Sequence, residues 1–251
     1  MGDVGGIVAV RVLGIHSSPR KYGNSFKMLW VALEAARRAG AETEYINLYD
    51  LSIGPCFACY SDYFLNCRYP KDPSECPLRG RDDYSLVAEA VLRSDAVVFS
   101  TPIYWFMVSG VLKNLFDRMT SLENMIYHAG RSLVDGKVAG VLAAGEEAGA
   151  STALSWSVFT LINMGFHVPA WGTAYHHGRG DVLDDKQAVS DSYNVGLNVV
   201  RLVKVLRGEE AGEEPWYRFL SDDEYRSLVE EARKAAEEMK AKQRRDRPWL
   251  R

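Results

Sequence analysis

The chain has 251 residues, of which 47% are hydrophobic and 25% charged, as in an ordinary globular protein and unlike collagen-like, disordered or disulfide-dense chains. Its formal net charge of −3 argues against a general nucleic-acid-binding protein. No run of about 18 apolar residues lacks polar interruption, so the sequence does not predict a membrane protein.

Short apolar segments alternate with helical patterns up to residue 207. The apolar segments are rich in Val and Ile and mostly lack alternation, which is typical of strands covered on both faces; they lie at residues 7–13, 43–48, 96–99, 138–144 and 167–174. Apolar residues spaced three and four apart predict helices around residues 26–33, 108–119, 151–164 and 183–206. Strands that alternate with helices predict a parallel, doubly wound sheet in a three-layer α/β domain.

The composition changes after Arg207, because residues 208–215 form a linker rich in Gly, Pro and Glu. Ser221 followed by Glu224 is a capping-box pattern, which predicts the start of a helix, and apolar residues then repeat at helical spacing to Met239. We therefore expect a domain at residues 1–207 and a linker with an amphipathic C-terminal helix at residues 208–251. The apolar stripe of that helix would dock on the domain or on a partner chain.

A hydroxyl-rich turn follows the first predicted strand and precedes the first predicted helix. Free N–H groups and the positive dipole end of a helix favour an anion at such a place. Further donors surround it: Ser17, Ser18, Arg20, Asn24 and Ser25. A phosphate monoester suits this arrangement, although Asn24 and Ser25 are also ordinary helix N-caps. The turn matches neither the P-loop nor the glycine pattern of dinucleotide-binding folds, which argues against an ATPase and an ordinary Rossmann dehydrogenase.

A second loop, rich in aromatic residues, follows the third predicted strand. Ligands of open α/β sheets bind outside the carboxyl ends of the strands, and the loops after the first and third strands flank that point. Flat apolar surface beside backbone N–H groups suits a planar ring system, and it would come from Pro102, Tyr104, Trp105 and Phe106. A third loop, at residues 144–152, reaches the same edge of the sheet.

The motif S-P-R-x-x-G-N-S, which begins at Ser18, precedes the motif P-I-Y-W, which begins at Pro102. In this order they resemble the NAD(P)H-dependent FMN reductase family over roughly residues 7–175. The resemblance implies a flavodoxin-like fold with strand order 2-1-3-4-5 and FMN as the cofactor. It assigns the FMN phosphate to the turn that contains Ser17, Ser18, Arg20, Asn24 and Ser25. It places the isoalloxazine ring beside Pro102, Ile103, Tyr104 and Trp105, with Gly145 on the third loop, and the adjoining aromatic residue Phe106 is a candidate for the same ring surface.

All four cysteines lie within 21 residues after the second predicted strand, with the spacing C-x2-C-x7-C-x8-C: Cys56, Cys59, Cys67 and Cys76. The first strand is not preceded by a signal-peptide pattern, so we expect a cytoplasmic protein, in which simple disulfides are rare. The compact cysteines resemble those of the iron–sulfur flavoprotein branch of the same family, which implies a [4Fe–4S] cluster in an insertion at residues 54–80. Zinc, free thiols and disulfides remain open as alternatives.

The resemblance implies an FMN-dependent oxidoreductase that takes electrons from NAD(P)H and passes them to a flavin, a quinone or another acceptor. The flavin carries the chemistry, so we expect no catalytic side chain. Two alternatives remain open: an iron–sulfur flavoprotein that relays electrons from ferredoxin, and an inactive, FMN-free binding module. The family's usual assembly and the apolar loop at residues 104–106 predict a homodimer or homotetramer, with neither nucleic acid nor a membrane as partner.

Overall fold

The computed structural model describes residues 8–69, 76, 78 and 80–246. Within them, five parallel strands form one sheet in the order β2-β1-β3-β4-β5. The strands are β1 (Arg11–His16), β2 (Glu42–Asn47), β3 (Ala96–Pro102), β4 (Val138–Gly145) and β5 (Thr173–His177). This order confirms the predicted doubly wound sheet.

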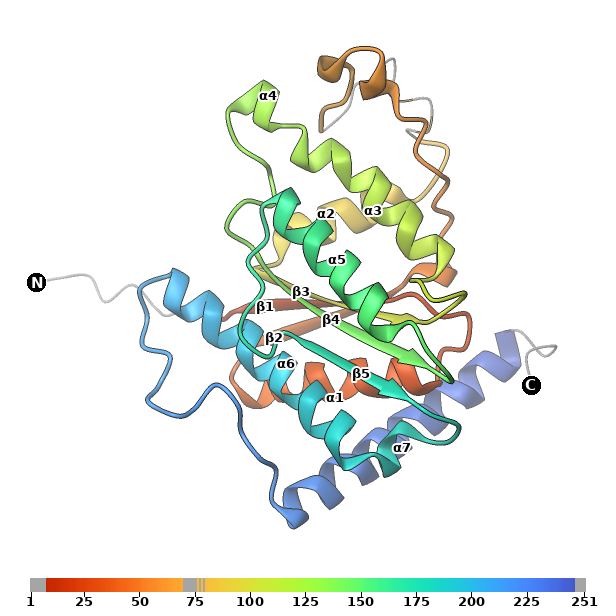
Figure 1. Cartoon of the computed structure of the whole chain (residues 1–251), viewed down its shortest axis with the longest axis vertical. Helices are drawn as coiled ribbons and strands as arrows, with labels where there is room; N and C mark the ends of the chain where they lie inside the picture. Colours follow the sequence, from red (N-terminus) through yellow and green to blue (C-terminus); the bar gives the residue numbers. More distant parts are fainter. Residues whose placement is uncertain (1–7, 70–75, 77, 79, 247–251) are drawn as a thin grey trace, which may run out of the picture.

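Helices cover both faces of the sheet (Figure 1). α1 (Asn24–Arg38) and α6 (Lys186–Leu206) pack on one face, and α2 (Tyr84–Arg93), α3 (Gly110–Glu123) and α5 (Ala150–Met164) pack on the other. A short helix, α4 (Ile126–Ala129), follows α3. Single 3-10 turns lie at Leu48–Asp50, Cys59–Ser61, Phe64–Asn66 and Val182–Asp184.

The central strands serve both cores at once. Val97 and Phe99 of β3 belong to the core with α2, α3 and α5, whereas Val98 belongs to the core with α1 and α6. Both faces being covered explains why β3 and β4 are uninterrupted apolar segments. On the face of the sheet that α1 and α6 cover, these two helices approach each other closely. A Cβ on Gly196 of α6 would lie 1.8 Å from the carbonyl oxygen of Ala32 in α1, so only glycine fits there.

Two predicted strands lie several residues further along the chain in the structure, and a third, predicted at residues 96–99, continues to Pro102 as β3. The fifth was expected at residues 167–174 but runs over Thr173–His177, because Pro169 and Gly172 lie in a turn before it. As an edge strand, β5 buries Ala174 and His176 and exposes Tyr175 and His177, so it shows no continuous apolar run. The first predicted strand, at residues 7–13, also lies further along, at β1; residue 7 is outside the described residues.

Helix α2 was not predicted from the sequence. Its buried face follows the helical spacing of Tyr84, Val87, Ala88 and Val91, directly after the cysteine-containing segment. This spacing is the signal that could have identified the helix. α2 completes the layer that packs on β1 and β3, beside α3.

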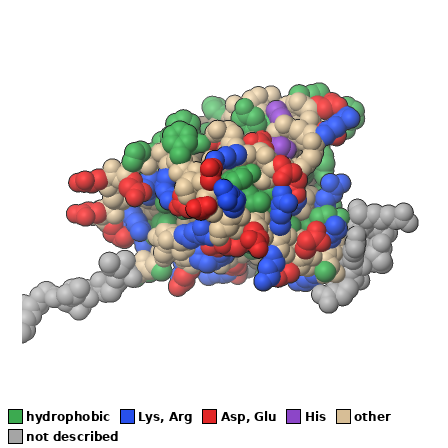
Figure 2. Space-filling model, turned by 90° about the horizontal axis from the view of Figure 1, so that it is seen from below, with side chains coloured by type: hydrophobic (Ala, Val, Ile, Leu, Met, Phe, Trp, Pro, Cys, Tyr) green, Lys and Arg blue, Asp and Glu red, His purple; other side chains and the backbone are tan. Residues whose placement is uncertain are grey.

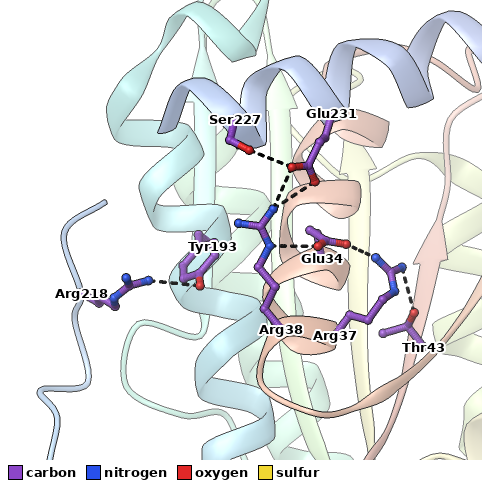
Figure 3. A network of polar contacts seen from close by, with 8 residues as sticks. All are labelled: Glu34, Arg37, Arg38, Thr43, Tyr193, Arg218, Ser227 and Glu231. Atoms are coloured by element: carbon purple, nitrogen blue, oxygen red, sulfur yellow. Dashed lines mark hydrogen bonds and ion pairs between the residues drawn. The ribbon is translucent and has the colours of Figure 1, made fainter. Parts of the chain in front are cut away.

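The C-terminal helix, α7 (Asp222–Asp246), packs against α1 and α6. The predicted capping box is confirmed: Ser221 N donates to Glu224 Oε2 (2.9 Å), and Glu224 N donates to Ser221 Oγ (3.3 Å). In Figure 3, Arg38 lies between Glu34 of its own helix, α1, and Glu231 of α7. Arg38 Nη2 donates to Glu231 Oε2 (3.0 Å). The helix is therefore fastened to the α1 side of the sheet by both apolar and charged contacts.

Charged side chains of both signs are mixed on the face drawn in Figure 2, which looks at the molecule from below the view of Figure 1. Lys and Arg alternate there with Asp and Glu, so this face carries no broad field of one sign. None of the helices in the described part of the chain is both long and apolar enough to cross a membrane.

Candidate functional site

A cleft of about 820 Å³ opens at the carboxyl ends of the strands. The loops after β1, β3, β4 and β5 line it, together with one residue of α7. Eight of the residues predicted to bind a cofactor line this cleft: Ser18, Arg20, Asn24, Ser25, Pro102, Ile103, Tyr104 and Gly145. The structure therefore brings the predicted phosphate turn and part of the predicted ring surface to one place.

The turn between β1 and α1 presents donors to the cleft. The residue before the helix is Gly23, which has no side chain with which to cap the free N–H groups of the first turn. Ser18 Oγ accepts a hydrogen bond from Arg20 N (3.1 Å), and the Arg20 side chain is exposed at the cleft. Free backbone N–H groups, the helix dipole and a guanidinium together fit a phosphate group.

Besides Ser18, three more of the predicted phosphate residues make side-chain hydrogen bonds within the protein. Ser17 is fully buried and donates through its hydroxyl to the Ser100 carbonyl (3.0 Å), so it does not line the cleft. Asn24 donates to the Gly180 carbonyl (2.8 Å) and accepts from Val182 N (3.2 Å), which fixes the loop after β5 against α1. Ser25 Oγ lies 3.0 Å from the His16 ring.

His16 lies directly beneath the turn, with none of its surface exposed. Its Nδ1 faces the amide of Asn47 (3.2 Å), which can only donate through Nδ2, so Nδ1 accepts and Nε2 carries the proton toward Ser25 Oγ. Burial disfavours the charged ring and lowers the pKa of His16 to about 3. A neutral His16 thus supports the turn as a hydrogen-bonding residue.

The loop after β3 is only partly directed at the cleft. Trp105 and Phe106 are predicted ring-contacting residues, yet they do not line the cleft and are 93% and 57% exposed. Both have positive φ angles, 50° and 66°, and the Tyr104 and Met107 backbones bond to each other across them. This tight turn leaves the two side chains exposed and outside the lining of the cleft.

Glycines let the neighbouring loops approach one another. A Cβ on Gly145 would lie 2.9 Å from Ile103 Cβ, and one on Gly149 would lie 2.4 Å from Phe106 Cα. The loops after β3 and β4 therefore form one packed wall, in which Gly145 permits the contact.

Several cleft residues were missed by the sequence analysis. Lys27 pairs with Asp181 (2.6 Å), and exposed Arg179 pairs with Glu146 (2.7 Å) across the mouth. Burial opposes ionisation of Asp181, but hydrogen bonds from Lys27 and Leu183 N hold its pKa below the ordinary value. The signal was the short G-R-G-D segment directly after β5, at the same sheet edge. Gln243, from α7, also lines the cleft.

A second, smaller cavity of about 120 Å³ contains all four cysteines in its lining. Cys67 is buried and the other three are partly exposed, and all are free thiols. Within the described ranges, no group of three or more Cys, His, Asp or Glu side chains is gathered tightly enough to hold a metal ion. The cysteines share a cavity without forming a closed site.

Side chains from α3 and its continuation hold the cysteine-containing segment. Arg118 and Asp82, only 5% and 6% exposed, form an ion pair. Asp82 accepts from Gly54 N (3.1 Å), two residues before Cys56. Asn124 Nδ2 donates to the Cys67 carbonyl (2.5 Å). These contacts fix the backbone on both sides of the cavity.

Comparison with known proteins shows which family this chain resembles. The family described as NADPH-dependent FMN reductase matches residues 10–177. An iron–sulfur flavoprotein of Methanocaldococcus jannaschii is 29% identical over 206 residues, which cover 79% of this chain and all of that protein. A putative NAD(P)H-dependent FMN-containing oxidoreductase of Bacillus subtilis is 31% identical over 116 residues, 44% of this chain and 63% of its own.

Solved structures agree on the fold. The structure of RosB with a bound 8-demethyl-8-formylriboflavin-5'-phosphate intermediate superposes with a TM-score of 0.64 at 17% identity, covering 90% of this chain and 88% of that one. A flavodoxin from the domain Archaea superposes with a TM-score of 0.50 at 9% identity, covering 79% and 99%. The fold is therefore flavodoxin-like, as predicted. With the family match over residues 10–177, the chain belongs to the NADPH-dependent FMN reductase family, and its relatives include iron–sulfur flavoproteins.

Proposed function

We propose that the protein is an FMN-dependent oxidoreductase that takes electrons from NAD(P)H and passes them to a flavin, a quinone or another acceptor. The observation that carries the proposal is the cleft itself, where the uncapped start of α1 and Arg20 lie together with the rings of Pro102 and Tyr104. Bound FMN supplies hydride and single-electron transfer. The side chains bind and orient the cofactor, so the proposal includes no catalytic acid or base.

The phosphate turn selects the cofactor. Gly23 leaves the first N–H groups of α1 free, Ser18 shapes the turn, and Arg20 supplies positive charge beside them. This is one anion site, and the chain has no second glycine-rich turn of the kind that holds a pyrophosphate. FMN, with a single phosphate, fits this donor set better than FAD.

The cysteine cavity supports a second redox group. Four thiols from one short segment suit a [4Fe–4S] cluster, and iron–sulfur flavoproteins stand among the relatives. Binding requires the four thiols to draw together, because they are not gathered into a metal site. The second candidate function, electron transfer from ferredoxin through such a cluster to FMN, rests on this cavity.

Anaerobic purification followed by optical and mass analysis tests both redox groups. We expect released FMN by mass spectrometry, and about four iron and four labile sulfide per chain. A Cys56→Ser, Cys59→Ser variant should lose the iron and keep the flavin. FAD as the sole flavin would exclude the proposed phosphate site, and iron-free wild-type protein with full flavin content would exclude the cluster.

Rapid mixing with NADPH separates the two functions. If NAD(P)H is the donor, the flavin absorbance should bleach on mixing, in the wild type and in the cysteine variant alike. If the protein relays electrons from ferredoxin, NADPH should leave the flavin oxidised while reduced ferredoxin bleaches it. Purified protein that binds no flavin at all would support the FMN-free module instead.

We also propose that the chain forms a homodimer or homotetramer around the flavin-binding domain of residues 1–207, with residues 208–251 as its helical extension. Exposed aromatic side chains support this, because Trp105 is 93% and Phe106 57% exposed beside the cleft. Apolar surface of this kind is commonly covered by a partner chain.

A further inference from the structure

Among the residues of α7 whose side chains the structure describes, Gln243 alone lines the cleft. Its side chain is almost fully buried, with 1% of its surface exposed. Its Oε1 accepts a hydrogen bond from Lys21 N (2.9 Å), and its Nε2 donates one to the Pro19 carbonyl (3.0 Å). A single amide therefore bonds the peptide groups on either side of Arg20.

The turn is held from the opposite side as well. Lys21 is buried and its ammonium pairs with Asp50. The Ser18 carbonyl accepts from Asn47 Nδ2 (3.2 Å), in the network around His16. A turn has few hydrogen bonds of its own, so these side chains decide where its backbone lies. Among the described residues of the C-terminal extension, only Gln243 forms hydrogen bonds with the backbone of this turn.

The position of Gln243 is fixed by the rest of α7. Leu228 and Ala232 are fully buried against the α1 side of the sheet. The Tyr225 hydroxyl donates to the Leu183 carbonyl (2.6 Å), and Arg233 pairs with Asp184 (2.5 Å). These contacts lie earlier in the helix than Gln243, so the helix reaches the turn as an anchored element.

The geometry points to Gln243 as a positioning residue for the flavin phosphate. By bonding to residues 19 and 21 it holds the Arg20 backbone, and so the turn's donors, in the arrangement that accepts a phosphate. This inference rests on the proposed binding of FMN. It predicts that Gln243 affects the affinity for the phosphate and leaves the affinity for the isoalloxazine ring unchanged.

Comparison of FMN with riboflavin tests the inference, because riboflavin has the same ring and no phosphate. Apoprotein is titrated with each flavin and binding is followed by quenching of flavin fluorescence. Gln243→Met keeps much of the side chain's volume but removes both hydrogen bonds. It should weaken FMN binding about tenfold, as expected for the loss of hydrogen bonds near a charged group, with riboflavin binding unchanged. Lys242→Ala, at an exposed position on the same turn of the helix, is the matched control and should leave both affinities as in the wild type.

A second variant covers the case in which Gln243→Met is poorly folded. Gln243→Glu keeps an acceptor for Lys21 N, loses the donor to Pro19 and adds negative charge beside the phosphate. It should weaken FMN binding more than Gln243→Met does, and added salt should reduce the difference. Equal weakening of FMN and riboflavin, or unchanged FMN affinity in both variants, would overturn the role of Gln243. Wild-type protein that binds riboflavin and FMN equally would overturn the phosphate site itself.

Discussion

Acidification should destabilise the protein through His16, the buried histidine beneath the phosphate turn. The folded protein holds this ring neutral, with its pKa lowered to about 3, whereas an unfolded chain has a histidine pKa of about 6.5. Below pH 6.5 the unfolded state therefore takes up a proton that the folded state does not. Stability is complete above pH 6.5, falls as the pH drops, and stops falling on this account near pH 3.

The size of the effect depends on how far the pH lies below 6.5, the histidine pKa of the unfolded chain. Each pH unit below 6.5 lowers the free energy of unfolding by about 1.4 kcal/mol, so at pH 4.5 the contribution of His16 amounts to about 3 kcal/mol. A domain stability is typically about 5–15 kcal/mol, so this loss is large enough to measure.

Urea unfolding at pH 7 and pH 4.5 provides the measurement. His16→Gln removes the titrating ring, so the variant should lose about 3 kcal/mol less than the wild type between the two pH values. The stability of the variant at pH 7 need not equal that of the wild type, because the test compares only how much stability each protein loses between pH 7 and pH 4.5. His167→Gln, at an exposed position, should behave like the wild type. If His16→Gln lost as much stability on acidification as the wild type, the buried neutral ring would not be the cause.

Three further outcomes are expected. Arg20→Ala should weaken FMN binding by about 1.5–3 kcal/mol in a flavin titration, the range for hydrogen bonds to charged groups, and equal affinity would show that Arg20 does not contact the phosphate. Asn124→Ala removes the donor to the Phe64 and Cys67 carbonyls, of which the Cys67 carbonyl still faces His128 Nε2 (3.1 Å), and should cost about 1–3 kcal/mol of stability with lower iron retention, unlike the exposed control Asn163→Ala. Light scattering should give a mass above that of one 28.1 kDa chain, and Trp105→Ser should lower it; a wild-type monomer would refute the proposed assembly.

The sheet was predictable because burial on both faces leaves a strong pattern. β3 and β4 read as continuous apolar segments: β4 was located to within one residue, and β3 was found from its first residue, although it continues three residues beyond its predicted end to Pro102. β5 was misplaced because an edge strand buries one face only, so its exposed Tyr175 and His177 broke the run. Apolar composition therefore identifies the central strands better than the edges of this sheet.

The phosphate turn was predictable in part. Its motif named Ser18 and Arg20, and both lie at the cleft. Sequence could not show that Ser17 turns inward to the Ser100 carbonyl, or that Trp105 and Phe106 turn outward, because loop direction depends on backbone angles. Residue type predicts what a side chain can bind, and the backbone decides whether it reaches the site.

Gln243 left a fainter signal. It continues the stripe of Leu228, Ala232 and Ala236 at helical spacing, and those three residues are buried. A polar residue at an apolar stripe position needs a hydrogen-bonding partner once it is buried. The pattern alone could thus indicate a polar contact, but not that its partner is the turn more than two hundred residues earlier.

The phosphate turn and the cysteine segment obtain their shape in the same physical way. Both are irregular segments that satisfy only some of their backbone groups internally, and in both a buried side-chain amide from elsewhere in the chain makes further bonds: Gln243 on α7 and Asn124 just after α3. Fixing the backbone in advance lowers the entropy lost when a ligand binds. The difference lies in what is fixed. Most of the proposed donors of the phosphate turn are N–H groups, which are in place once its backbone is fixed, and the exposed Arg20 side chain adds its charge to them. The cysteines proposed as cluster ligands would act through side chains that must still converge, so we expect binding of a cluster to reorganise that segment.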